Sequence, residues 1–407
     1  MHDTRAIRFA LLLAACPLVA CDGGTALPDA GPPLGDAGGP TDAGPPPAEC
    51  PEGYPLADLA GKPVFSGTIN GQPARIVWDT GAPTSALDDG AFDRIGEGPY
   101  TIELGGRTIT SRPLSVVDFA RYGIDGVDGV FGADIFGDYA VTIDVDRARF
   151  WIDDAIDEDA LLACSHVAGN PTTVQAVNAG YFYVPGNAEG LEGWFLLDTG
   201  ASLGAMPDST FDAIEAANPR PYLSGFYTQA AIGTFYARLA PVARLEMGDL
   251  GVDHILTRTV RDDLIPPAPG GGTFLGVVPT GFLRHFLLTV YYPTSEIRLD
   301  AYEGDTLREP SQFFVVGISI EDGTADPVHV AGVLEGSAAA EAGVMVGDVI
   351  VSVRGTPMAS LTPSERPWAL VSRGLGEMVD VVIERDGAPM TLMLEARDLL
   401  IASPTDM

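Results

Sequence analysis

Positive charge is scarce in this chain. Lys62 is the only lysine, and 23 Lys and Arg stand against 56 Asp and Glu, which gives a formal net charge of −33. A protein that binds nucleic acid must neutralise phosphates with basic side chains. The composition therefore excludes a nucleic-acid-binding protein, and we expect no nucleic acid among the partners.

The chain also lacks an apolar run long enough to serve as a permanent membrane span. Arg5 and Arg8 precede the N-terminal run FALLLAACPLVAC, which is shorter than the roughly 20 residues that a transmembrane helix needs. Basic residues before a short apolar segment are typical of an export signal. The segment ends in LVAC, which resembles a bacterial lipobox and predicts a lipoprotein signal peptide over residues 1–21, with Cys21 lipidated. The alternative is an ordinary secretory signal that is cleaved nearby.

Residues 22–49 have almost no apolar side chains and repeat Asp-Ala-Gly and proline. Such a tract has too little apolar surface to form a core, and it predicts a disordered tether. We therefore expect an exported protein that is lipid-anchored to a bacterial membrane and faces the periplasm or the cell exterior.

Cysteine is rare, with four in 407 residues. Cys16 belongs to the signal and Cys21 would carry lipid, so Cys50 and Cys164 remain for the folded protein. Two thiols in an exported protein favour a disulfide over a metal site; the alternative is two free thiols. The sequence has no paired-histidine zinc motif, and the acidic stretch at 153–160 lacks the glycine of a calcium loop. We expect no metal and no cofactor.

Glycine and proline are abundant, at 49 and 33 residues, which indicates many turns and short strands. Within this pattern, residues 63–95 resemble residues 181–214. Each copy reads as a hairpin, a buried strand, a turn and a short helix. Further parallels join 100–117 to 243–260 and 126–153 to 271–300. The repeat predicts a mainly β protein with two pseudo-symmetric lobes, at residues 50–165 and 166–305.

The second copy carries an insertion. From Asp79 to Glu103 the chain advances 24 residues, but from Asp198 to the equivalent Glu246 it advances 48. The extra length includes GFYTQAAIGTFYARLA at 225–240, two β-prone arms around a tip. We expect a long hairpin there, with Ile232, Gly233 and Thr234 at the tip.

Each copy contains Asp-Thr-Gly after apolar residues: IVWDTG at 76–81 and FLLDTG at 195–200. Burial at the end of a strand disfavours the charge of a carboxyl group. If the two lobes meet about a pseudo-two-fold axis, Asp79 and Asp198 come together and share one proton. One carboxylate then acts as a base toward water while the protonated partner donates to a carbonyl oxygen.

These turns resemble the active-site turns of aspartic peptidases of the retropepsin-like and pepsin-like kind. The resemblance covers residues 60–302 and implies two acid-protease β-barrel lobes, a water nucleophile, a monomeric catalytic unit, and a peptide or protein substrate. It implies that Asp79 and Asp198 are the catalytic pair, and that the 225–240 hairpin is the flap. The supporting residues that it implies are Thr80, Gly81, Thr199, Gly200, Ser202, and the glycines Gly132 and Gly276 of an apolar-apolar-glycine motif behind each aspartate.

The first turn departs from the family pattern. Pro83 stands where the second turn has Ser202, whose hydroxyl is expected to bond the outer oxygen of the aspartate. Thr84 is a candidate substitute for that hydroxyl. Trp78 is also bulky for the position before the aspartate.

Residues 310–400 resemble a PDZ domain of the kind found in exported bacterial proteases. The resemblance rests on VVGISI at 315–320, VLEGSAAAEAGVMVGDVIVSVRG at 333–355 and ERPWALVSR at 365–373. It implies an α+β module that binds a C-terminal peptide as an added strand, with Val316, Gly317 and Ile318 in the carboxylate-binding loop. The alternative is a PDZ domain that only packs on the two lobes.

Taken together, the sequence predicts an exported, membrane-tethered aspartic endopeptidase. The alternative is a non-catalytic peptide-binding lipoprotein that retains the fold. The segment GASLG at 200–204 also matches a serine-hydrolase elbow, but no histidine follows in a partner context, so this third hypothesis is the weakest.

Overall fold

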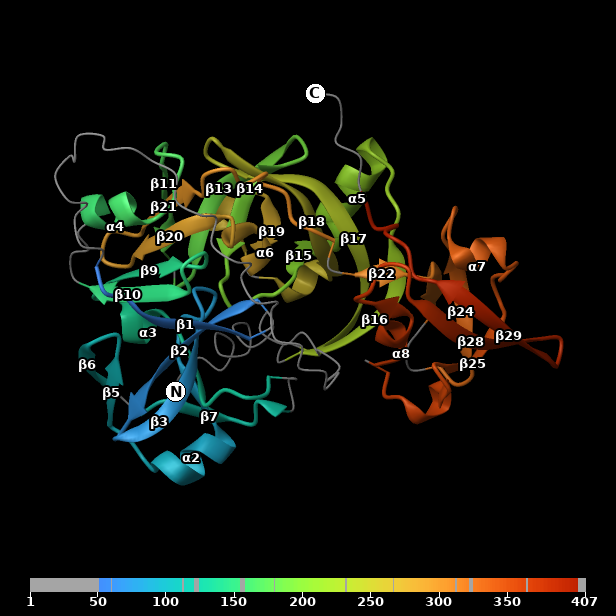
Figure 1. The fold of residues 1–407 in the computed structure, drawn as a ribbon, viewed down its shortest axis with the longest axis horizontal. Helices are drawn as coiled ribbons and strands as arrows, with labels where there is room; N and C mark the ends of the chain where they lie inside the picture. Colours follow the sequence, from blue (N-terminus) through green and yellow to red (C-terminus); the bar gives the residue numbers. More distant parts are fainter. Residues whose placement is uncertain are drawn as a thin grey trace, which may run out of the picture.

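The computed structural model describes residues 51–401, apart from 60, 112, 121–123, 154–157, 179, 231–232, 266, 312, 322–324 and 364. Strands dominate this part of the chain (Figure 1), so the prediction of a mainly β protein is confirmed. None of its helices is long and apolar enough to cross a membrane. The predicted signal peptide and tether, including Cys21, lie outside the described residues.

The first lobe comprises ten strands and three helices of the described chain. They are β1 (Tyr54–Leu59), β2 (Lys62–Ile69), β3 (Gln72–Trp78), β4 (Ala86–Asp88), α2 (Asp89–Ile95), β5 (Tyr100–Leu104), β6 (Arg107–Ser111), β7 (Ser115–Val117), β8 (Gly129–Phe131), α3 (Ala133–Phe136), β9 (Ala140–Asp144), β10 (Arg149–Asp153) and α4 (Glu158–Cys164).

The second lobe has a similar order of elements and includes two strands that are longer than any in the first lobe. Its elements are β11 (Thr172–Gln175), β12 (Val177–Asn178), β13 (Phe182–Ala188), β14 (Leu191–Leu197), β15 (Gly204–Pro207), α5 (Asp208–Ala217), β16 (Leu223–Ala230), β17 (Gly233–Met247), β18 (Leu250–Val260), η2 (Asp262–Leu264), η3 (Pro269–Gly271), β19 (Phe274–Val278), α6 (Thr280–Leu283), β20 (Phe286–Tyr291) and β21 (Glu296–Ala301).

The two lobes have equivalent strand registers. In the first lobe β2 pairs with β5, with Thr68 opposite Glu103. In the second, β13 pairs with β17, with Asn187 opposite Glu246. The strand order and register therefore support the internal repeat and the equivalence of the two glutamates, while the predicted lobe boundaries remain predictions.

A shared sheet joins the lobes. β9 of the first lobe pairs antiparallel with β20 of the second, and β10 and β21 flank this pair (Figure 1). The hydroxyl groups of Thr142 and Thr289 lie 2.8 Å apart across the junction. β9 is buried along its whole length because it lies inside this sheet. The pairing gives the lobes a fixed relative orientation.

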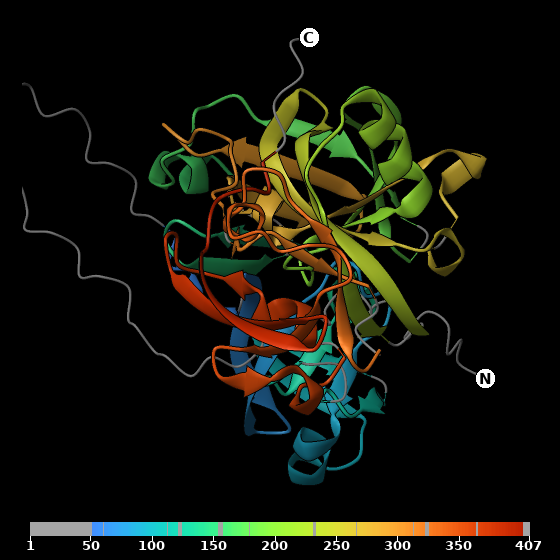
Figure 2. The ribbon, with the colours of Figure 1, turned by 90° about the vertical axis from the view of Figure 1, so that its right-hand side faces the viewer.

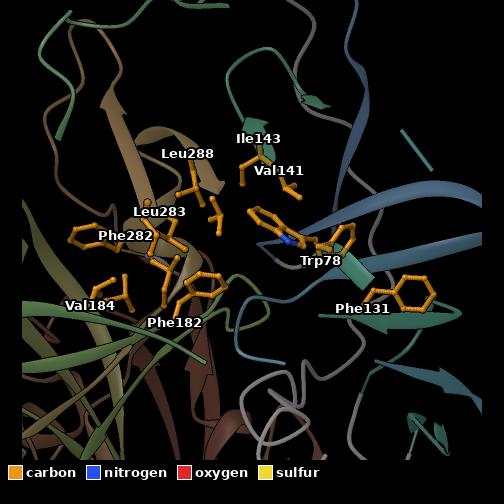
Figure 3. Packing of buried hydrophobic residues seen from close by; sticks show 14 of the residues in the cluster. Trp78, Phe131, Val141, Ile143, Phe182, Val184, Phe282, Leu283 and Leu288 are labelled. Atoms are coloured by element: carbon orange, nitrogen blue, oxygen red, sulfur yellow. The ribbon is translucent and has the colours of Figure 1, made fainter. Parts of the chain in front are cut away.

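One apolar cluster extends through both lobes. Figure 3 shows Trp78 near Val141 and Ile143 of β9 and near Leu288 of β20, which directly opposes Ile143 in the shared sheet. All four side chains are buried. Burial of a large apolar side chain contributes roughly 1.5–3 kcal/mol, so this continuous core stabilises the lobes as one unit.

The C-terminal unit is a small sheet with short helices, in orange and red in Figure 2, in front of the lobes. Its elements are β22 (Phe314–Val315), β23 (Ile318–Ile320), β24 (Val328–Val333), α7 (Ala338–Glu341), β25 (Val349–Val353), β26 (Thr356–Pro357), η4 (Met358–Ser360), α8 (Glu365–Ala369), β27 (Val371–Ser372), β28 (Met378–Arg385) and β29 (Ala388–Glu395).

This unit is fastened to the second lobe. The imidazole of His254 in β18 is hydrogen-bonded through Nδ1 to the carbonyl of Glu309, at 3.0 Å, and through Nε2 to that of Leu400, at 2.9 Å. These carbonyls lie just before and just after the strands of the C-terminal unit. One buried side chain therefore holds both of its ends.

The predicted hairpin in the second lobe is present. β16 and β17 pair antiparallel up to Ala230 and Gly233. Ile232 of the predicted tip lies outside the described residues, whereas Gly233 and Thr234 belong to β17. The hairpin accounts for most of the 24 extra residues of the second copy, and the longer helix α5 supplies the rest.

Candidate active site

Asp79 and Asp198 occupy equivalent places at the ends of β3 and β14. The amide of Asp79 donates to the carbonyl of Phe131 at 3.0 Å, and that of Asp198 donates to the carbonyl of Val278 at 3.2 Å. Both strands end in buried apolar residues, IVW in the first and FLL in the second. The strand pairing in each lobe therefore fixes where the chain turns and positions the aspartate at that turn.

The two turns are joined by reciprocal hydrogen bonds. The Thr80 hydroxyl donates to the carbonyl of Leu197 at 2.8 Å, and the Thr199 hydroxyl donates to the carbonyl of Trp78 at 2.6 Å. Each hydroxyl also accepts from the amide of the opposite threonine at 3.1 Å. Both threonines are buried. The predicted role of Thr80 and Thr199 as a brace between the turns fits this geometry.

Each turn glycine packs on the carboxyl group of the other turn. A Cβ on Gly81 would lie 2.6 Å from Asp198 Cγ, and one on Gly200 would lie 2.7 Å from Asp79 Cγ. The amide of each glycine also donates to Oδ1 of its own aspartate at 2.8 Å. The structure thus brings the two predicted acids together, and only glycine leaves room for this approach.

Burial raises the pKa of both acids. Asp79 and Asp198 are fully buried. Burial, followed by the negative charge of Asp198, raises the pKa of Asp79 well above its usual value. Burial also raises the pKa of Asp198 to about 6. Oδ2 of each acid has no hydrogen-bond donor among the described residues. The arrangement favours a pair that retains one proton where isolated aspartates would be ionised.

Lys62 acts in the opposite direction. Its positive charge lowers the pKa of both Asp79 and Asp198, although burial dominates. Its side chain is only 4% exposed, at the start of β2. Sequence reasoning did not identify this residue as part of the site; its status as the only lysine was the one available signal.

The expected difference between the two turns at Pro83 and Ser202 is not seen at the outer oxygens. Oδ2 of Asp79 and Oδ2 of Asp198 both lack a hydrogen-bond donor in the described part of the chain. Thr84, the proposed substitute, is exposed. The turns are therefore alike in this respect, because the amide of the turn glycine holds Oδ1 in each and no hydroxyl reaches Oδ2.

Trp78 fits its position because it is part of the shared core. Its indole Nε1 donates to the hydroxyl of Tyr292 at 2.9 Å, and its ring stacks on Phe65 with centroids 6.0 Å apart. Tyr292 directly follows β20 of the second lobe. The bulky side chain thus points away from the turn and links the lobes.

The predicted pair Gly132 and Gly276 requires a correction. Trp78 pairs with Phe131 in β8, and the equivalent Leu197 pairs with Val278 in β19. The counterpart of Gly132 is therefore Pro279, and Gly276 lies three residues too early. Gly276 of β19 resembles Gly132 in sequence because Phe274-Leu275-Gly276 has the same apolar-apolar-glycine pattern as the motif in the first lobe.

A cavity of about 530 Å³ lies beside the second turn. It is bounded by Lys62 of the first lobe, by Thr199 and Ser202 of the second, and by Phe313 and Arg373 of the C-terminal unit. Cavities of this size are typical of ligand sites. All three parts of the described chain contribute to its wall.

The remaining predicted residues are placed as follows. Val316 and Ile318 are buried on either side of Gly317, which has φ +90° and forms the turn between β22 and β23. Cys164 is disulfide-bonded, whereas Cys50 lies outside the described residues, so their pairing stays a prediction. Among the described residues no group of His, Cys, Asp and Glu could hold a metal ion.

Comparison with known proteins identifies the C-terminal unit. Residues 308–384 match the family model of the PDZ domain. The prediction of a C-terminal PDZ domain is therefore confirmed, and with it a module for binding peptides. The match is confined to that part of the chain.

Among solved structures, the chain is similar to a photosystem II D1 C-terminal processing protease. The two are 30% identical over 23% of this chain and 25% of that one, with a TM-score of 0.21. The similarity thus spans about a quarter of the length of that protein. No curated protein matches the chain.

Proposed function

We propose that this protein is an exported aspartic endopeptidase whose two lobes have the acid-protease fold. The observation that carries the proposal is the reciprocal packing at the turns, where each aspartate lies against the turn glycine of the other lobe. Stability alone gives little reason to bury two carboxyl groups together, because that burial is costly. A shared proton gives them a chemical use.

The reaction follows from that proton. The ionised carboxylate takes a proton from water, whose oxygen attacks the carbonyl carbon of the peptide bond. The protonated carboxyl group donates to the carbonyl oxygen, which would otherwise carry the developing charge. Collapse of the tetrahedral intermediate breaks the C–N bond; the nitrogen leaves with a proton from the pair, and a hydroxyl group of the intermediate returns its proton to the pair as the new carboxyl group forms. Atoms and protons balance, and Asp79 and Asp198 end with one proton between them.

The described conformation is closed. Both aspartates are fully buried, so a substrate reaches them only after the site opens. We propose the hairpin of β16 and β17 as the flap that moves, because it is the insertion that distinguishes the second lobe from the first. The cavity bounded by Lys62, Thr199 and Ser202 is the candidate space for a substrate side chain.

The rest of the proposal concerns the setting of the enzyme. Both aspartates belong to one chain, so the catalytic unit is a monomer. The lipid on Cys21 anchors the chain to a bacterial membrane, facing the periplasm or the exterior, and residues 22–49 tether it. The PDZ domain recognises a peptide or protein partner, for which a free C-terminus is the expected feature.

Cleavage of a mixed peptide library tests the proposal. The full chain is compared with Asp79→Asn, Asp198→Asn and the control Asp249→Asn, from about pH 3 to about pH 8, which brackets the range in which the pair titrates. Asp249 is exposed in the turn between β17 and β18. We expect each dyad variant to lose at least about 100-fold in rate and the control to keep its rate.

Two outcomes would overturn the proposal. If the unmodified protein cleaves nothing at any pH, the chain is not an endopeptidase and the peptide-binding alternative is favoured. If cleavage survives both Asp79→Asn and Asp198→Asn, the chemistry lies elsewhere in the protein.

A further inference from the structure

The peptide-binding edge of the PDZ domain is a strand that has a backbone-paired neighbour in its own sheet on one side only. β23 follows the turn at Gly317 and is the terminal strand of its sheet, where it pairs only with β24. A PDZ domain takes its peptide as an added strand on such an edge. We assign the helix α8 as the opposite wall of the groove, because α8 and β23 both contact β16 of the second lobe.

In this structure β16 of the second lobe lies on that edge. The amide of Ser224 donates to Ser319 Oγ at 3.1 Å, and the hydroxyl of Ser224 donates to the carbonyl of Ile320 at 3.4 Å. Ser319 and Ile320 are the last two residues of β23. Figure 1 shows β16 between β17 and the PDZ domain. The two bonds thus use polar groups that an added peptide strand would approach.

Gly225 makes the close approach possible. It has φ +89°, which an L side chain rarely adopts, and a Cβ there would lie 2.4 Å from the carbonyl oxygen of Ile320. The pairing of β16 with β17 shifts register between Leu223 and Phe226, around this glycine. A bulge of this kind re-aims the strand locally. The backbone of β16 is therefore bent onto β23 at a residue that only glycine can occupy.

The helical wall of the groove is covered as well. The ring of Phe226 meets that of Trp368 in α8 edge-on, with centroids 4.9 Å apart. Phe313 packs on the same indole at 5.3 Å, and Phe226 is only 5% exposed. An aromatic side chain of β16 thus lies against the helix while the backbone beside it lies on the edge strand.

We propose that β16 is the resident occupant of the PDZ groove, and that a peptide with a free C-terminus competes with it. A peptide that adds to β23 needs the space that Ser224 and Gly225 fill. Its binding therefore displaces this part of β16. The apparent affinity for the peptide therefore equals the affinity of the open groove multiplied by the fraction of molecules in which β16 has already left.

A second consequence rests on the proposed function. β16 is one arm of the hairpin proposed as the flap, so its release from the PDZ domain frees that hairpin to move. By linkage, a peptide that binds better when β16 is released shifts the protein toward the state with a mobile hairpin. Peptide capture at the PDZ domain would then open the closed site.

The test uses two matched glycine variants of the full chain. Gly225→Ala carries the clash with Ile320, whereas Gly190→Ala is the control, because Gly190 has φ +91° and open space around it. Both variants also carry Asp79→Asn, so no peptide is consumed. The probe is a fluorescein-labelled mixture of hexapeptides with free, apolar C-termini, and binding is followed by anisotropy. Hydrogen exchange of the β16 and β23 amides is measured in parallel.

We expect Gly225→Ala to bind the probe at least about tenfold tighter than Gly190→Ala, as for a groove that was open no more than one-tenth of the time. Exchange at residues 318–320 should rise in that variant. In the control, adding the probe should raise exchange in β16. Phe226→Ala serves as the second variant if Gly225→Ala does not fold, with the same expected direction.

Equal affinities in the folded variants, or probe binding that leaves exchange in β16 unchanged, would overturn the proposal. These readouts do not require catalysis. If the protein cleaves no peptide but β16 competes with the probe, only the proposed peptidase activity is refuted. If the protein cleaves peptides but β16 does not compete with the probe, only the proposed role of β16 is refuted. Stimulation of library cleavage by the unlabelled hexapeptides, with Asp79 restored, then tests the coupling.

Discussion

The Thr199 hydroxyl donates a hydrogen bond of 2.6 Å to the backbone carbonyl of Trp78, from the turn of one lobe to the strand of the other. The Thr80 hydroxyl makes the reciprocal bond to Leu197 at 2.8 Å. Both carbonyls belong to residues that directly precede an aspartate. These bonds therefore help to fix the relative position of Asp79 and Asp198.

Removing one of these hydroxyls should destabilise the protein. Thr80→Val leaves the carbonyl of Leu197 and the amide of Thr199 without their present partner in a buried place. The expected loss in free energy of unfolding is about 1–3 kcal/mol for each such group. Chemical denaturation measures it. Thr80→Ser keeps the hydroxyl, so a Ser variant as unstable as the Val variant would contradict the role of these bonds.

The stability of the protein should depend on pH through the aspartate pair. The pKa of Asp198 is raised to about 6 in the folded state, above the value near 3.9 of an unfolded chain. The folded state therefore binds this proton more tightly, and its contribution to stability is present below about pH 4 and is lost as pH rises through about 6.

Asp198→Asn removes that titration. The melting temperature of the variant, relative to the unmodified protein, should rise between about pH 4 and about pH 7. Thermal unfolding at several pH values measures the difference, and Asp249→Asn is the control. A difference that does not change with pH would show that the folded pKa of this acid is ordinary.

Lys62 should set the pH range of activity. Its charge favours the ionised forms of both aspartates, so Lys62→Met should raise both pKa values and move both limbs of a bell-shaped profile to higher pH. Lys62→Arg keeps the charge and should leave the limbs close to their original places. The measurement is kcat/KM against pH on the best library peptide. An unshifted profile for Lys62→Met would remove Lys62 from the site.

The disulfide of Cys164 should stabilise the fold. Its loss in Cys164→Ser should lower the free energy of unfolding by about 2–4 kcal/mol. Intact mass with and without reductant, followed by peptide mapping, identifies the partner, for which we expect Cys50. A free thiol at Cys50 in the unreduced protein would contradict the pairing.

Much of the site could be predicted because the chain repeats itself. Two Asp-Thr-Gly turns in duplicated surroundings predicted that Asp79 and Asp198 meet, and the structure brings them together. The 24 extra residues predicted the hairpin of β16 and β17. The glycine loop and the pattern after it predicted the PDZ domain. In each case the prediction depends on a local feature of the sequence: the turn residues, the alternation of apolar residues in a strand, or the spacing between two motifs.

What could not be predicted depends on contacts between distant segments. Gly276 was aligned with Gly132 because the apolar-apolar-glycine pattern recurs, and only the strand pairing shows that Pro279 is the true counterpart. Lys62 lies 17 residues before Asp79, with no local signal of its proximity to the acids. The contact of β16 with the PDZ domain brings Gly225 next to Ile320, and these two residues are neighbours only in the folded chain.

The most direct test of the central claim is a titration of the two carboxyl groups themselves. In protein labelled with ¹³C at aspartate Cγ, Asp79→Asn and Asp198→Asn assign the two signals. We predict that both signals of the unmodified protein respond to the same two protonation steps, the upper one well above the usual aspartate value, because the acids share a proton. Two independent titrations near the ordinary pKa, about 3.9, would contradict a shared proton and the mechanism built on it.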